Sequence, residues 1–127
     1  MESAILKLAI ICFFVTGLSH VVRPKVWAQL FISMHRKGEA GSFLNALLHF
    51  PLGLLIVSFH NVWHGLPVIL TLMGWGLVLK SLIYFVFPGH AARLLGRVSL
   101  ERAWEFTVAG IFSIGLSGLL MFDLLSR

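Results

Sequence analysis

The chain alternates between long apolar runs and short polar connections, and four of the runs are long enough to cross a bilayer. A span needs about 20 mostly apolar residues, because a helix rises about 1.5 Å per residue through roughly 30 Å of hydrocarbon. The runs are Ala4–Val22, Phe43–Trp63, Leu66–Phe87 and Ala103–Leu125. The pattern therefore predicts an all-α fold, a four-helix transmembrane bundle.

Two of the connections carry a second helical pattern, in which a proline is followed three residues later by an apolar stripe. The first stretch is Arg23–Met34 with Pro24, and the second is Phe87–Val98 with Pro88. The stripes are Trp27, Leu30, Phe31 and Met34 in the first, and Ala91, Leu94, Leu95 and Val98 in the second. Proline suits the first position of a helix, and a stripe beside basic residues is typical of a helix that lies in a membrane interface. We expect two short interfacial amphipathic helices.

Corresponding positions of these two stretches are 64 residues apart. Spans one and three run in the same direction, and each leads into the same element. This spacing predicts that the chain is a parallel duplication of a two-span unit, with repeat 1 over 1–63 and repeat 2 over 64–127, in one integral membrane domain. Such a duplication places its pseudo-twofold axis along the membrane normal.

The composition agrees with a membrane protein. Of 127 residues, 58% are hydrophobic and 12% are charged, and the mean hydropathy is +0.94, so the chain lacks the polar exterior of a soluble domain. No basic segment precedes the first run and no small-residue cleavage site follows it, so we interpret it as a retained span and not as a signal peptide. Cys12 is the only cysteine, which excludes an internal disulfide.

The net charge of +5 comes mainly from the first and third connections. Seven of the ten basic residues lie there: Arg23, Lys25, Arg36, Lys37, Arg93, Arg97 and Arg102. By the positive-inside rule both connections face the cytoplasm, which leaves both termini on the periplasmic side of a bacterial inner membrane. We expect these residues and Trp27 to contact lipid headgroups, and their position between apolar runs argues against nucleic acid.

The first connection also carries a motif. It consists of Pro24, Lys25, Val26 and Trp27, followed by Ile32, Ser33 and Met34. This motif between two spans resembles the YjeT-like family of small bacterial inner-membrane proteins of unknown function, and implies a two-span membrane hairpin. The second half keeps Pro88 but has Gly89 and Ala91 where the first half has Lys25 and Trp27. The four-span layout is also similar to DoxX-type four-helix membrane proteins.

Two charges fall inside the spans. Lys80 lies about two turns inside span three, and Glu105 lies about one turn inside span four. Because an unpaired charge at such depth costs roughly 2 to 3 kcal/mol, we expect the two to form a structural ion pair that fixes how span three docks on span four. The alternative is a proton or ion pathway, which would need more titratable groups along the spans.

The histidines raise two possibilities of ligand binding. His20 and His49 lie on neighbouring spans and could hold a haem iron between them. Alternatively, His20 contacts a headgroup and His49 bonds a carbonyl or a hydroxyl inside the bundle. His60 and His64 are four residues apart and would share one face if the helix continued that far. Neither a carboxylate nor a cysteine accompanies them, so we expect interfacial histidines here. The sequence predicts no metal and no cofactor.

Small residues suggest faces for close helix packing. Ala109, Ser113 and Ser117 recur every four residues in span four, with Gly110 and Gly118 beside them. Span one has a similar face, formed by Ala9, Cys12, Thr16 and Ser19. Helices in lipid associate where small residues permit close approach, so these faces should pack against other helices, either in the same chain or in another protein.

No nucleophile with a base beside it, no acid pair and no phosphate cradle can be assembled from these residues, which argues against an enzyme. We therefore expect a non-catalytic accessory or scaffold subunit that packs against a larger membrane complex or against copies of itself. The first alternative is a small transporter or channel for a lipid, an ion or a metabolite. The second is a haem- or quinone-binding protein of electron transfer.

Overall fold

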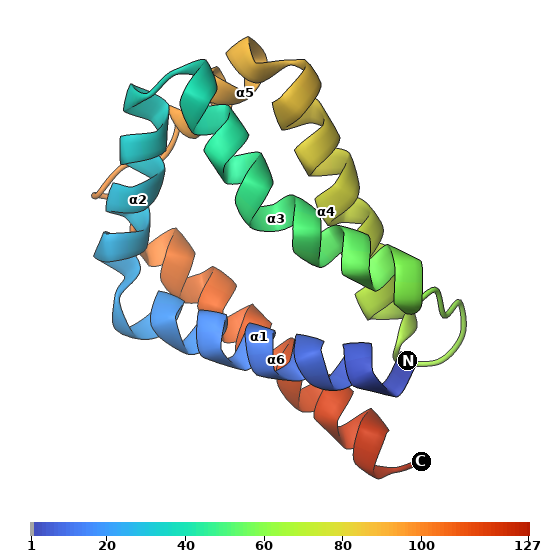
Figure 1. Ribbon diagram of the computed structural model, residues 1–127. Coiled ribbons are helices and arrows are strands. Elements are labelled where there is room, and N and C mark those ends of the chain that lie inside the picture. Colours follow the sequence, from blue (N-terminus) through green and yellow to red (C-terminus); the bar gives the residue numbers. More distant parts are fainter. Residues whose placement is uncertain (1) are drawn as a thin grey trace.

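A computed structural model describes residues 2–127 as an all-helical chain. Figure 1 shows its helices, which are α1 (Glu2–Val22), α2 (Pro24–Arg36), α3 (Glu39–Phe59), α4 (Val68–Val86), α5 (Pro88–Leu95) and α6 (Trp104–Leu125). The four long helices α1, α3, α4 and α6 are each long and apolar enough to cross a membrane. The predicted helical bundle is confirmed, with helix ends that differ from the expected ones by a few residues.

The short helices α2 and α5 both begin at the proline that the sequence pattern identified. The residue before each proline leaves the helical conformation, with φ −129° and ψ 56° at Arg23 and φ −122° and ψ 60° at Phe87. A proline disfavours helical geometry in the residue before it, so the chain turns at these two points. Helix α5 ends at Leu95 and is therefore shorter than the expected helix to Val98.

The long helices pack as two pairs, α1 along α6 and α3 along α4 (Figure 1). Glycines allow the close approach of the first pair, because a Cβ at Gly110 would lie 2.6 Å from the carbonyl oxygen of Gly17. The expected docking of span three on span four is not what the structure has: span four packs against span one, and span three packs against span two.

The two pairs meet near the chain termini and the α3–α4 connection, and they separate toward α2 (Figure 1). A core cluster joins the pairs at the end where they meet, and its members Leu6, Ile56, Leu70 and Leu120 are each 0% exposed. These four side chains come from four different long helices. They pack the two helix pairs against each other at the end near the chain termini.

At the opposite end, α2 and α5 pack against each other and against the α3/α4 pair. A second cluster there contains Met34 of α2, Tyr84 of α4 and Leu95 of α5. The His35 ring donates from Nδ1 to the carbonyl of Ala92 at 2.7 Å, which ties α2 to α5. Both basic connections therefore lie at the same end of the molecule.

The connection between α3 and α4 is longer than the two residues, His64 and Gly65, that separate the second and third apolar runs in the sequence. Helix α3 ends at Phe59, and the chain resumes a helix only at Val68. The buried Thr71 hydroxyl holds this loop, since it accepts from the Val62 amide at 3.0 Å and donates to the Val62 carbonyl at 2.7 Å. Gly65 supplies a positive φ of 68°, which a residue with a side chain rarely adopts.

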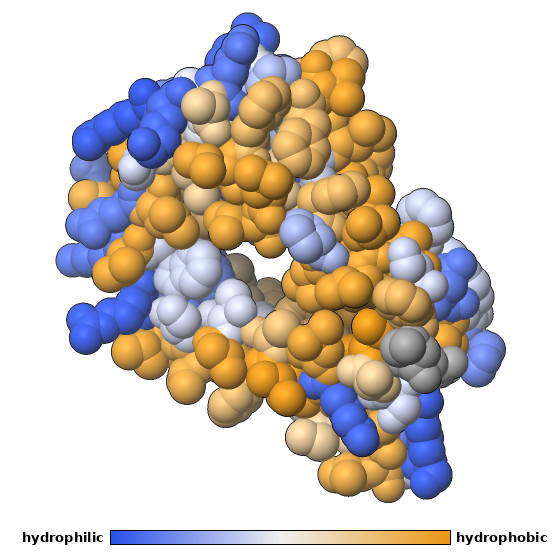
Figure 2. Space-filling view, in the orientation of Figure 1, coloured by the Kyte–Doolittle hydropathy of each residue, from blue (hydrophilic) through white to orange (hydrophobic). Residues whose placement is uncertain are grey.

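The surface of the molecule fits a bilayer. Figure 2 shows hydrophilic residues gathered around α2 at one end and near the α3–α4 connection and the chain termini at the other, with apolar surface over the long helices between them. Many large apolar side chains point outward from these helices, Phe112 among them at 76% exposure. The structure is that of a small integral membrane protein.

Candidate functional site

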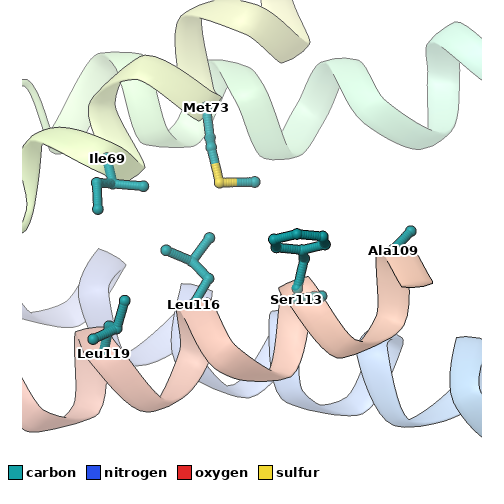
Figure 3. Close-up of a pocket in the computed structure, with 7 residues that line it drawn as sticks. Ile69, Met73, Ala109, Ser113, Leu116 and Leu119 are labelled. Atoms are coloured by element: carbon teal, nitrogen blue, oxygen red, sulfur yellow. The ribbon is translucent and has the colours of Figure 1, made fainter. Parts of the chain in front are cut away.

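A groove with apolar walls runs between α4 and α6, where the two helix pairs begin to separate. Its volume is about 470 Å³. It is lined by Ile69 and Met73 from α4 and by Ala109, Phe112, Ser113, Leu116 and Leu119 from α6. Figure 3 shows Ile69 and Met73 pointing across the space toward the labelled residues of α6. In a membrane this groove would open to hydrocarbon.

The groove is apolar because its one hydroxyl group is satisfied elsewhere. Ser113 donates from Oγ to the carbonyl of Phe13 in α1 at 2.7 Å. One turn further along α6, Ser117 donates to the carbonyl of Ile10 at 2.8 Å. Polar atoms that already have partners make a groove wall that suits an apolar occupant.

Two charged residues lie on the same two helices as the groove, beyond the residues that line it. On α4, Lys80 lies seven residues beyond Met73, two turns along the face that also carries Ile69. On α6, Glu105 lies four residues before Ala109, and a smaller depression lined by Glu105, Phe106 and Ala109 adjoins the main groove at Ala109. Glu105 therefore lies beside the groove, whereas Lys80 lies further along α4 than the residues that line it. Figure 2 shows an opening between the two helix pairs.

Lys80 and Glu105 do not form the expected ion pair. Within residues 3–127, no carboxylate oxygen lies within 4.0 Å of the Lys80 ammonium, and the ion pair found in that part of the chain joins Asp123 to Arg127. The physical reason is that α4 and α6 belong to different helix pairs. Instead the Lys80 Nζ lies over the ring of Tyr84, 5.3 Å from its centroid and one turn nearer the polar end of α4. Glu105 is exposed.

The structure gives His20 and His49 similar local hydrogen bonds but separate surroundings. His20 donates from Nδ1 to the carbonyl of Thr16 at 2.7 Å, and His49 donates from Nδ1 to the carbonyl of Asn45 at 2.9 Å. The His20 ring stacks on Trp27 with 4.1 Å between centroids. Among residues 3–127, the His20 ring stacks on Trp27 and Phe106, and no ring contact joins it to His49.

His60 and His64 do not share a helix face, because α3 ends at Phe59. His60 is fully buried and donates from Nε2 to the Pro67 carbonyl at 3.2 Å, whereas His64 is exposed. Among the residues whose side chains are described, no three histidine, cysteine or acidic groups come together as metal ligands would.

The small-residue faces of α1 and α6 pack partly against each other. Ser117 is buried and Ser113 is half-buried at the contact with α1, and Ala9 on α1 is fully buried. Ala109, by contrast, is exposed in the groove, and Thr16 is exposed as well. The neighbour of Ser113 and Ser117 is therefore internal, while part of the predicted face is left free.

The basic residues stay on the surface. All seven that flank the first and third connections are exposed: Arg23, Lys25, Arg36, Lys37, Arg93, Arg97 and Arg102. Trp27 is half-buried, and its indole N–H donates to the Ser19 hydroxyl at 2.8 Å. The sequence reading missed Asn45, whose side chain is fully buried beside Met34. An asparagine within an apolar run indicates such burial, but the sequence does not show that its partner, Met34, lies on another helix.

No family model matches the chain, and the searches of curated proteins and of solved structures found no similar protein.

Proposed function

We propose that the protein is a small non-catalytic membrane protein that holds one phospholipid in the groove between α4 and α6. The observation that carries this proposal is an apolar groove of about 470 Å³ between the two helix pairs, whose one hydroxyl group is already bonded to α1. On α6 the residues that line the groove run from Ala109 to Leu119, which spans about 15 Å of helix. That length is roughly half of the hydrocarbon thickness, the depth that one acyl chain of a single leaflet covers.

A lipid in the groove makes contacts with two helices that it could not make in the surrounding bilayer. The two walls of the groove belong to different helix pairs, so an occupant contacts α4 and α6 together and fills the space that the separated pairs leave. A void in a packed interior loses dispersion contacts, and an acyl chain restores them. We infer that a bound lipid keeps the two helix pairs at a fixed separation.

The test is native mass spectrometry of the protein extracted in a mild detergent. We expect one phospholipid per chain to be retained by the unchanged protein and lost from Ala109→Trp, whose indole would occupy the groove. Val108→Trp is the matched control, since Val108 is 41% exposed and does not line the groove. Equal retention by the unchanged protein and Ala109→Trp would refute the proposal.

A second candidate function is the accessory role, in which the protein packs against another membrane protein or a second copy. It is favoured by Gly115 and Gly118 of α6, where an added Cβ would meet no atom within 4 Å. Such an open glycine surface permits close approach of another helix. Substituting both by isoleucine should release a co-extracted partner or dissociate a dimer, and would leave lipid retention unchanged.

We also propose that the chain arose by parallel duplication. Three observations support it. Leu6 and Leu70 are 64 residues apart, as are Ile56 and Leu120, and all four are fully buried. The residues before the two prolines have nearly the same φ and ψ. In the two halves α1 corresponds to α4, and α3 corresponds to α6. Under this correspondence the α1/α6 pair is equivalent to the α4/α3 pair.

For its membrane orientation we propose a bacterial inner membrane with both basic connections in the cytoplasm and both termini in the periplasm. The common location of α2 and α5 at one end supports this arrangement, because the seven exposed basic residues then face one leaflet. In that orientation α2 and α5 lie at the headgroup level as interfacial helices.

A further inference from the structure

A second groove runs between α1 and α6, and these two helices alone line it. It consists of two adjoining hollows of about 350 and 280 Å³, which share Ile10 and Ile11 of α1 and Met121 of α6. The first hollow extends along α1 to Phe14, and the second extends in the opposite direction to Lys7. From Lys7 to Phe14 the groove follows about 10 Å of helix. It is therefore an elongated space with a lysine at one end.

The floor of this groove is closed, and its polar atoms have partners. Ile10 is 5% exposed and Ser117 is 4% exposed, and the Ser117 hydroxyl donates to the Ile10 carbonyl at 2.8 Å. The groove is hollow at Gly118, where an added Cβ would meet no atom within 4 Å. Ile11 and Met121 border it and are 62% and 43% exposed. Walls of this kind suit a hydrocarbon chain.

Lys7 gives the groove one charged end. It is exposed and lies about 7.5 Å along the helix axis from the start of α1. Within residues 3–127 no carboxylate oxygen lies within 4.0 Å of its ammonium, and the carboxylate of Asp123 is paired with Arg127 at 3.0 Å. A lysine at this depth extends its ammonium to the headgroup level while its stem stays in hydrocarbon. The group that a lipid presents there is a phosphate, which the compact positive charge of a lysine attracts.

We propose that the groove between α1 and α6 binds a phospholipid of the leaflet at the end of the chain termini, with its phosphate on Lys7 and one acyl chain along Ile11 and Met121. The site is separate from the groove between α4 and α6 and does not depend on the lipid proposed there. The acyl chain covers Gly118, so the phospholipid competes with any helix that would pack on this part of α6.

The test is photo-crosslinking in phosphatidylcholine vesicles, because a lipid held by one helix pair should exchange during extraction with detergent. Phosphatidylglycerol and diacylglycerol probes carry the same diazirine-bearing acyl chain, and labelled residues are identified by mass spectrometry. We expect the phosphatidylglycerol probe to label Phe14 and Met121 about fivefold more than the diacylglycerol probe, because one lysine near the interface adds a modest attraction for an anion. Leu72 of α4 is exposed and lines neither hollow, so both probes should label it equally.

Two pairs of variants test the two ends of the groove. Lys7→Met should abolish the difference between the probes, whereas Lys7→Arg and the control Lys37→Met should retain it. Gly118→Leu should fill the groove and lower labelling by phosphatidylglycerol at least threefold. Gly115→Leu is its matched control, since an added Cβ there also meets no atom within 4 Å and Gly115 lines neither hollow. Circular dichroism checks that all five variants fold.

Three results would overturn the proposal. The first is equal labelling of Phe14 and Met121 by the two probes. The second is a difference between the probes that survives Lys7→Met. The third is an equal effect of Gly118→Leu and Gly115→Leu, which would identify a packed helix as the occupant of this face of α6.

Discussion

The contact between α1 and α6 depends on two glycines, and Gly110→Ala should weaken it. A Cβ at Gly110 would lie 2.6 Å from the Gly17 carbonyl oxygen and 2.8 Å from the Cβ of His20. The first of these atoms belongs to the backbone, so no side-chain rotation can relieve the clash. To reach an ordinary contact of 3.4 Å, the two helices must move apart by about 0.8 Å.

The loss of stability has two parts, the overpacking itself and the stretching of two hydrogen bonds between α1 and α6. Overpacking of this kind costs about 1 to 3 kcal/mol. The same movement would stretch the hydrogen bonds from Ser113 and Ser117 to the α1 backbone, which are now 2.7 and 2.8 Å long. Hydrogen bonds between membrane helices contribute about 0.6 kcal/mol each. We therefore expect Gly110→Ala to lower the free energy of unfolding by about 2 to 4 kcal/mol.

The assay is equilibrium unfolding in mixed micelles of mild detergent and dodecyl sulfate, followed by tryptophan fluorescence. Gly118→Ala is the matched control in the same helix, because an added Cβ there meets no atom within 4 Å. It should change the free energy of unfolding by less than about 0.5 kcal/mol. If Gly110→Ala were as stable as Gly118→Ala, the close α1/α6 contact and the pairing built on it would be wrong.

Three further predictions concern the ends of the bundle. Thr71→Val keeps the shape of the side chain but leaves the buried Val62 amide without its acceptor, so unfolding in the same assay should become easier by about 1 to 3 kcal/mol. Trp27→Phe keeps an aromatic ring against α1 but removes an indole N–H that donates a hydrogen bond at 2.8 Å, and should cost about 0.5 to 1.5 kcal/mol. Lys37→Cys and Arg97→Cys, each in a cysteine-free background, should react with an impermeant maleimide from the same side of the membrane; reaction from opposite sides would contradict the parallel duplication.

Hydropathy was enough to locate the long helices, because every backbone polar group in a bilayer must be bonded inside its own helix or barrel. The two prolines also predicted the starts of α2 and α5 correctly. The α3–α4 connection was not predictable in this way. His60 and Trp63 continue the apolar run in the sequence, yet the loop is fixed by a hydroxyl from Thr71, which lies in the next helix.

The pairing of the long helices was the second feature that the sequence did not predict. Small residues marked a packing face on α6, but they did not identify α1 as the neighbour that accepts hydrogen bonds from Ser113 and Ser117. The expectation for Lys80 and Glu105 used their depth alone. Depth is a one-dimensional property, whereas the distance between two side chains depends on which helices pack together. The groove could not be predicted from the sequence either, because its existence depends on α4 and α6 belonging to different helix pairs.

The pairing of α1 with α6 also has a consequence for biosynthesis. The first helix ends at Val22, and its partner begins only at Trp104, about 80 residues later. At roughly 5 to 20 residues per second, a ribosome needs about 4 to 16 seconds to supply that partner. During this interval the glycine and alanine surface of the first helix has no packing partner in the nascent chain, and the membrane insertion machinery must shield it until α6 has been synthesised.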